Sequence, residues 1–189
     1  MAMQGDHAAY YHALYRVALL VNSSLDPQEV LSTVVRGVAD AMHARACSLR
    51  LLDRSGTILE MAAACGLSEH YLNKGSVAVA ASSIDREALS GKVVRVQEVR
   101  TDTRLQYPEE LAQEGIVSML CTPLIRHQVP IGVMRVYTGE PRQFAQDEID
   151  FLQALADICA LSIENARMYD ALQRTYEVGM EALWGSADR

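Results

Sequence analysis

The chain has 189 residues, of which 50% are hydrophobic and 22% charged, with a net charge of −7. This fits one globular domain with a full core and a helical extension. The basic residues are scattered, which argues against nucleic-acid binding. No apolar stretch approaches the ~20 residues of a membrane span, and the first residues lack the order of a signal peptide. We therefore expect a cytoplasmic protein without a nucleic-acid or membrane partner.

Two helices are predicted at the start of the chain. The first runs from about Asp6 to Val21, because apolar residues recur there at helical spacing on one face. Asp26, a good N-cap, and Pro27, at the first helical position, begin the second helix, which continues to about Met42.

The middle of the chain predicts a hairpin, a short helix and a further strand. Residues 47–53 alternate leucines with polar residues, and after a turn the strand 58–64 completes the hairpin. Residues 66–81 carry loop signals and remain ambiguous. Two serines can cap a short helix over 82–89, which is followed by a strand over 93–99.

The last third predicts a short helix, a second hairpin and a long helix. Pro108 begins the short helix, which ends at Gly115. Strands over 117–125 and 131–138 flank a turn at 127–130. Helical spacing then begins near Ala145 and persists to Leu183, and roughly 39 residues at about 1.5 Å each would span about 58 Å. That exceeds a domain of this size, so part of this helix needs another partner. The order of elements and the short hairpin connections favour an α+β fold with an antiparallel sheet.

Four segments, in this order, resemble the GAF domain, a small-molecule sensor module of bacterial signalling proteins. They read SLDPQEVLSTVVRGV, CSLRLLDRSGTILEMAAACGLS, SIDREALSGKVVRVQEVRTDTR and EGIVSMLCTPLIRHQVPIGVMRVYTGEPRQFAQDEIDFLQALADICALSIENARMY. The similarity covers about Leu25 to Tyr169. We therefore divide the chain into an amino-terminal helix (1–24), a GAF sensory domain (25–169) and a helical extension (170–189).

The resemblance implies a GAF/PAS-like α+β fold with about six antiparallel strands. The terminal helices would pack on one face of the sheet, and a ligand pocket would lie on the other. It also implies a sensor and not an enzyme, although fold alone does not fix function. No kinase, cyclase or DNA-binding segment is evident in residues 170–189, so we expect either a separate output protein or a longer protein of which this chain is the sensory part.

Sub-family signatures exclude some classes of ligand but do not identify the ligand. Cyclic-nucleotide binders carry an Asn-Lys pair where this chain has Thr138-Gly139, although Phe144, Asp147 and Glu148 match the second half of their signature. The alternative role of these three is helix initiation. Covalent bilin binders attach the tetrapyrrole through a cysteine before the late hairpin or in the amino-terminal arm, and this chain has no Cys or His in residues 101–118 and no Cys before Cys47. Free methionine sulfoxide reductases need a catalytic cysteine in the same segment, 101–118, which contains none.

Strand alternation puts Ser48 and Arg50 on one side of the first strand, and Arg135 and Tyr137 on one side of the last strand. The resemblance implies that these two strands lie side by side, which brings the four polar side chains together on the pocket side of the sheet. The predicted floor of the site consists of Ser48, Arg50, Arg135 and Tyr137. Two guanidinium groups on a half-buried surface favour a small anionic ligand. The alternative is that they pair with chain carboxylates such as Asp102 or Glu98. The predicted lid consists of Ile84, Val99, Arg104, Tyr107, Leu111 and Val117, of which Leu111 and Val117 can equally be ordinary core.

Two further expectations concern the terminal helices and the cysteines. A homodimer is predicted through apolar residues of both helices, with an intramolecular helix pair as the alternative; these residues are Tyr11, Leu14, Tyr15, Ala18, Ile163, Ala166, Tyr169, Leu172 and Tyr176. The cysteines have no metal-ligand spacing, and we expect free, mostly buried thiols. Two other functions stay open: an enzyme of this fold with Cys65 or Cys121 as nucleophile, and an interaction module whose pocket is filled by its own side chains.

Overall fold

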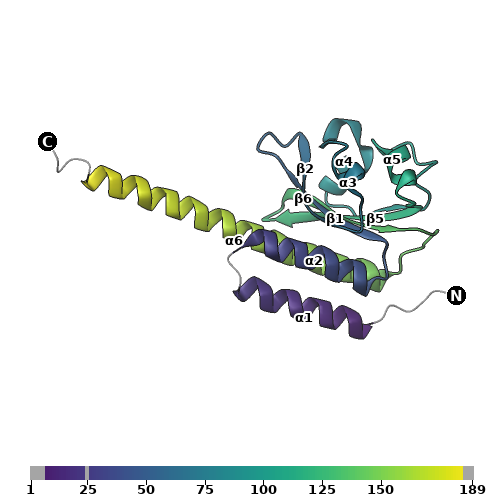
Figure 1. Ribbon diagram of the computed structural model, residues 1–189, viewed down its shortest axis with the longest axis horizontal. Helices are drawn as coiled ribbons and strands as arrows, with labels where there is room; N and C mark the ends of the chain where they lie inside the picture. Colours follow the sequence, from purple (N-terminus) through teal and green to yellow (C-terminus); the bar gives the residue numbers. More distant parts are fainter. Residues whose placement is uncertain (1–6, 24–25, 185–189) are drawn as a thin grey trace.

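The computed structural model describes residues 7–23 and 26–184, arranged as a helical layer, a sheet and a cover of short helices (Figure 1). The helical layer contains α1 (His7–Ser23), α2 (Pro27–Ala41) and the start of α6 (Gln146–Trp184). The cover contains α3 (Glu69–Leu72), the 3-10 turn η1 (Val79–Ala81), α4 (Ser83–Leu89) and α5 (Pro108–Gln113). Asp6 and Leu25, two predicted boundaries, lie outside the described residues.

The sheet has six strands in the order β3-β2-β1-β6-β5-β4, and every neighbouring pair is antiparallel. The strands are β1 (Ala46–Leu52), β2 (Ile58–Cys65), β3 (Val77–Ala78), β4 (Val94–Val96), β5 (Ser118–Arg126) and β6 (Val129–Thr138). The expected α+β fold is confirmed, with the terminal helices on one face. The strand β1 pairs with β6, far away in sequence, so the two predicted hairpins join at the middle of the sheet.

The amino-terminal helices form as their residues predict. Asp26 is the N-cap of α2, where its Oδ1 accepts a hydrogen bond from the Gln28 backbone N–H at 2.8 Å. Tyr10 and Val17 on α1 are buried, and the Tyr10 ring stacks on Phe151 of α6 with centroids 4.2 Å apart. Since α1 packs on α2 and α6, it belongs to the same core as the sheet.

The structure differs from the prediction at one turn and one strand, and it assigns the stretch that the sequence left ambiguous. The turn of the late hairpin has two residues instead of four, because His127 and Gln128 adopt positive φ angles of 48° and 67° and reverse the chain at once. Val129 and Pro130 therefore belong to β6. The predicted strand 93–99 forms over 94–96 only, where β4 pairs with β5 as an edge strand. The ambiguous stretch 66–81 contains α3, β3 and η1.

The start of α6 shows what the matched acidic signature does in this chain. A Glu148 carboxylate oxygen accepts a hydrogen bond from the Ala145 backbone N–H at 2.8 Å, and Arg142 donates to the other oxygen. Phe144 is buried among the helices. Both residues therefore build the helix start on the face opposite the expected pocket, as the helix-initiation reading predicts.

The long final helix is confirmed. The helix α6 has 39 residues, and its carboxyl half projects beyond the sheet (Figure 1). Phe151, Leu155 and Cys159 are buried in its first half, whereas Tyr169 and Leu172 are 53% and 70% exposed farther along. None of the helices in the described ranges is long and apolar enough to cross a membrane.

Candidate functional site

The alternation of β1 and β6 sorts their side chains between the two faces of the sheet. Leu49 packs among the terminal helices, so Ser48 and Arg50 project to the other side. We call this side, covered by α3, α4 and α5, the pocket face (Figure 1). Ser48 lies directly opposite Arg135 in the β1–β6 ladder. The hydroxyl groups of Ser48 and Tyr137 are hydrogen-bonded at 2.9 Å. The four predicted floor residues are thus brought together.

Arg135 has a carboxylate partner that the sequence did not predict. Its Nη2 donates to both carboxylate oxygens of Asp85, which lies in the first turn of α4. The two side chains are only 4% and 0% exposed. Burial is the largest single effect and disfavours the charged guanidinium, but the Asp85 carboxylate, together with Tyr137, Cys121 and Tyr71, outweighs it and holds the pKa of Arg135 well above its ordinary value.

The carboxylates that were predicted as partners are engaged elsewhere. Asp102 forms an ion pair with Arg104 at 2.6 Å, and Glu98 accepts a hydrogen bond from the Arg100 backbone N–H at 3.1 Å. The alternative that a chain carboxylate pairs with a floor arginine therefore holds for Arg135, but the partner is Asp85 and not Asp102 or Glu98. Asp102 and Glu98 lie in the loop after β4, where local backbone and side-chain donors satisfy them first.

Arg50 is buried without a carboxylate partner in the described structure. It is 1% exposed, and its Nη1 donates to the Leu59 carbonyl oxygen at 3.3 Å. Its Nε and Nη2 have no hydrogen-bond partner among the residues that the structure describes. Burial lowers the pKa of Arg50, and the positive charge of Arg135 lowers it further.

A third cation, Lys74, lies above the floor and was not predicted. Its Nζ sits over the rings of Tyr71 and Tyr107, 4.5 Å and 4.1 Å from the two centroids. This nitrogen is buried and has no hydrogen-bond partner among the described residues. Burial, followed by the charges of Arg50 and Arg135, lowers the pKa of Lys74 to about 7. Its only sequence signal was its position in a loop marked by Asn73 and Gly75.

The space between floor and cover is a cavity of about 10 Å³. This is room for about one water molecule. Its lining comes from the floor, the cover helices and the loops before them: Tyr71, Val77, Ser82, Leu105, Gln106, Tyr107, Leu111 and Arg135. A larger hollow of about 460 Å³ lies between α1 and α2, but the charged side chains beside it, such as Arg36 and Asp40, are exposed.

The predicted lid residues fall into three groups. Tyr107 and Leu111 line the cavity. Ile84 and Val99 are fully buried in the same apolar cluster without lining it. The remaining two lie farther out: Arg104 pairs with Asp102 and Glu87 near the surface, and the Val117 carbonyl accepts a hydrogen bond from the Val99 N–H at 2.8 Å.

All four cysteines are free, and none is a ready nucleophile. Cys121 lies opposite Arg135 in the β5–β6 ladder, and burial raises the pKa of its thiol to about 12. Burial likewise raises the pKa of the Cys65 thiol, which is half-buried. Among the residues the structure describes, no group of three or more His, Cys, Asp or Glu could hold a metal ion.

Comparison with known proteins finds one family and a related sensor. The family model for the GAF domain matches residues 26–163. A methyl sulfide methyltransferase-associated sensor of Methanosarcina acetivorans is 26% identical over 165 residues, which are 85% of this chain but only 16% of that protein.

Two solved structures show the same fold. The GAF domain of a phosphoenolpyruvate-protein phosphotransferase from Coxiella burnetii has a TM-score of 0.78 and 22% identity, with 88% of this chain and 99% of that one covered. Free methionine-R-sulfoxide reductase from Neisseria meningitidis, solved with its substrate, has a TM-score of 0.73 and 19% identity, with 89% and 97% covered.

Proposed function

Because the chain belongs to the GAF domain family, we propose that it is a sensory domain that binds a small molecule on its pocket face. The observation that carries this proposal is that several buried polar atoms lack hydrogen-bond partners in the described structure. In the described part of the chain, four buried side-chain nitrogens have no hydrogen-bond partner: Arg50 Nε, Arg50 Nη2, Lys74 Nζ and Arg135 Nε. All four belong to the cations of the pocket face. Folded proteins rarely leave such donors unsatisfied, because each costs about 1–3 kcal/mol.

The sheet offers a short route from the site to the helices. On β6, Arg135 and Tyr137 face the site, whereas Met134 and Val136 pack in the helical core. On β5, the Thr122 hydroxyl is hydrogen-bonded to Gln153 of α6, next to Cys121 on the pocket face. A ligand that moves these strands by a fraction of an ångström therefore changes the packing under α6. Binding alters output only when the ligand prefers one helix arrangement over another.

Thiol chemistry is the less favoured function. The similar fold of a sulfoxide reductase makes an enzyme conceivable, with Cys65 or Cys121 as nucleophile. Attack on sulfur requires a thiolate, and burial raises the pKa of both thiols. We therefore propose a non-enzymatic role.

A ligand-free interaction module is the second candidate, and the small cavity favours it. At about 10 Å³ the cavity admits no organic molecule unless the cover moves. Native mass spectrometry of the purified chain separates the two functions. A sensor carries or takes up a small molecule at one equivalent per chain. A chain that shows only its bare mass, after exposure to a cell extract as well, contradicts the sensor proposal.

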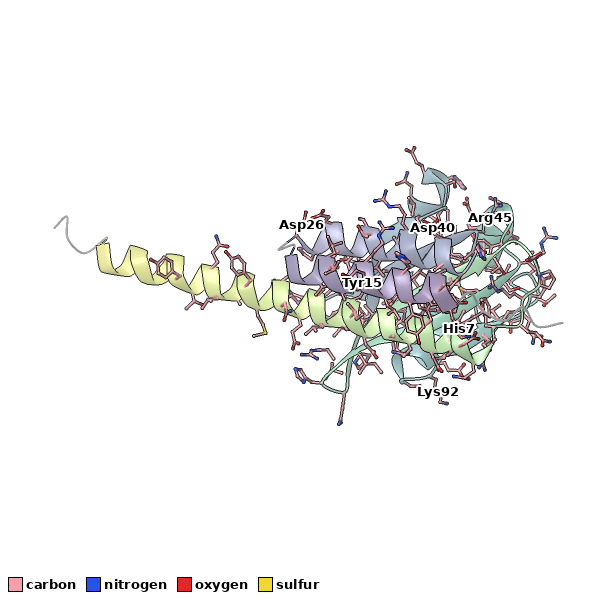
Figure 2. The ribbon with its side chains drawn as sticks, turned by 90° about the horizontal axis from the view of Figure 1, so that it is seen from below. His7, Tyr15, Asp26, Asp40, Arg45 and Lys92 are labelled. Carbon is pink, nitrogen blue, oxygen red and sulfur yellow. The ribbon has the colours of Figure 1, made fainter. Side chains whose placement is uncertain are left out.

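The terminal helices supply a surface for the proposed homodimer. Figure 2 views the helical layer from outside, with Tyr15 labelled on α1. Tyr11 and Tyr15 are 75% and 63% exposed, and Tyr176 on the projecting part of α6 is 68% exposed. Of the predicted set, Ile163 is instead buried in the core of its own chain. Aromatic side chains at this exposure, on a helix that projects beyond its domain, favour burial against a second copy.

Light scattering tests the dimer. We expect the mass of two chains for the intact protein and of one chain after truncation behind Tyr169. A monomeric intact chain contradicts the proposal. In the proposed dimer, residues 25–169 form the sensory domain that binds the ligand, whereas residues 1–24 and 170–189 hold the two copies together. We further propose a cytoplasmic location and an output that lies in a separate protein or in other parts of a longer one, since the related sensor extends far beyond the matched region.

A further inference from the structure

The pocket face carries more buried positive charge than the protein itself balances. Arg135 is neutralised by Asp85. Arg50 and Lys74 have no carboxylate within ion-pairing distance in the described structure. Glu110 of α5 and Asp85 act on Lys74 through longer-range electrostatics, and Tyr137, Tyr71 and Asp85 act on Arg50 in the same way. A guanidinium keeps its charge inside a protein, so the unbalanced charge of Arg50 persists whatever the state of Lys74.

The excess charge restricts the chemistry of the ligand. A neutral molecule with carbonyl groups would satisfy the free N–H donors but would leave the buried charge uncompensated, which is the larger cost. An anion satisfies both. Charge-assisted hydrogen bonds from Arg and Lys to an anionic oxygen are also shorter and stronger than neutral ones.

The one carboxylate that pairs with these cations in the described structure, Asp85, indicates which anion fits. Both oxygens of the Asp85 carboxylate accept from Arg135 Nη2, while Arg135 Nε remains free. The neighbouring cavity of about 10 Å³ is much too small for a phosphate ester or a nucleotide. A flat carboxylate requires the least movement of the cover.

Building on the proposed function, we propose that the ligand is a small organic acid whose carboxylate binds Arg50 and Lys74 and competes with Asp85 for Arg135. In the ligand-free protein Asp85 acts as an internal substitute for the ligand. Exchange of the two carboxylates breaks the buried ion pair between α4 and β6.

Besides this ion pair, α4 packs on the sheet through the buried Ile84 and Ala88, and the other polar contacts of the cover are weak enough for a ligand to exchange. Ser83 at the start of α4 donates its backbone N–H to the Arg104 carbonyl at 3.0 Å. The Ala78 N–H donates to Gln106 Oε1 at 3.0 Å, and the Tyr107 hydroxyl donates to the Ser76 carbonyl at 3.2 Å. These are single hydrogen bonds near the surface, each worth about 0.5–1.5 kcal/mol. Binding energy of this size is within reach of one ion-paired carboxylate.

Calorimetric titration at constant ionic strength tests the proposal. The probes are sodium acetate, malonate and succinate, with inorganic phosphate and the neutral diamide succinamide as comparisons. We expect saturable binding of at least one carboxylate, loss of binding in Arg50→Met and Lys74→Met, and no change in Arg36→Met, whose arginine is exposed on α2. Asp85→Asn removes the competing charge, so it should bind the acid more tightly than the parent does.

Several results would overturn the proposal. Binding of phosphate or succinamide in place of the carboxylates assigns another ligand class, while the proposed sensor function stands. Carboxylate binding that survives in Arg50→Met shows an adventitious salt effect. Weaker binding in Asp85→Asn, in a variant that gives the folded circular dichroism spectrum, contradicts the competition; if that variant does not fold, Arg50→Met and Lys74→Met decide. If no probe binds and native mass spectrometry also finds no bound molecule, the sensor function fails as well.

Discussion

Replacing Arg50 by methionine should stabilise the ligand-free protein, which is unusual for a change at a fully buried residue. Methionine retains most of the unbranched side-chain volume and removes two donors, Nε and Nη2, that have no partner. At the lower end of the usual range of about 1–3 kcal/mol for each unsatisfied donor, their removal gains about 2 kcal/mol. The lost hydrogen bond to the Leu59 carbonyl offsets about 1 kcal/mol. The free energy of unfolding should therefore rise by about 1 kcal/mol or more, and Tm by about 2–4 °C.

Urea denaturation monitored by circular dichroism measures this change. The protein is first unfolded and refolded to remove bound small molecules. Arg36→Met is the matched control, and it should change the free energy of unfolding by no more than about 0.5 kcal/mol because Arg36 is exposed on the opposite side of the molecule. If Arg50→Met lowers the free energy of unfolding by more than about 1 kcal/mol, Arg50 is already satisfied in the ligand-free fold. The argument for a ligand at this site then loses its basis.

Three further predictions concern Asp85, Lys74 and the cysteines. Asp85→Ala should lower the free energy of unfolding by about 3–5 kcal/mol, because Arg135 keeps a buried, uncompensated charge; a loss below about 1 kcal/mol in urea denaturation would contradict the buried ion pair. Since the pKa of Lys74 is lowered to about 7 in the fold, the unfolded chain binds more protons above that pH. Ligand-free stability should therefore rise from about pH 7 towards the ordinary lysine pKa of ~10.4. In Lys74→Met the free energy of unfolding should rise less between these pH values. An identical pH profile in the variant would refute the lowered pKa of Lys74. A thiol reagent at pH 8 should label the native protein only at the half-buried Cys65, and more slowly than free cysteine, whereas fast labelling of Cys121 would revive the enzyme hypothesis.

The sequence was informative about the floor of the site for a simple physical reason. Side chains in a strand alternate with a period of two, so the positions of Ser48 and Arg50 relative to the leucines of β1 fix the face on which they lie. The same rule holds for Arg135 and Tyr137 in β6. The family resemblance supplied the strand order that makes β1 and β6 neighbours, which alternation alone does not give.

The cover was not predictable in the same way. Asp85 and Lys74 reach the site because a short helix and a loop fold over the sheet, and the height and rotation of such segments depend on long-range packing. The helix over 82–89 was predicted, with Ser82 as its cap, yet nothing local indicated that Asp85 would meet Arg135. Acidic residues in a first helical turn usually stabilise the helix through its dipole. The sequence therefore gives no sign that Asp85 also forms an ion pair.

The most direct test observes the unsatisfied nitrogens themselves. Nitrogen-15 NMR of arginine side chains resolves individual Nε–H signals, and Arg50→Met identifies the Arg50 signal by its disappearance. On addition of the acid selected by calorimetry, the Arg50 and Arg135 Nε–H signals should move downfield as each donor gains an acceptor, while the Arg36 signal stays in place. If the acid binds and both buried signals remain unmoved, the ligand lies elsewhere and the pocket face is not the sensory site.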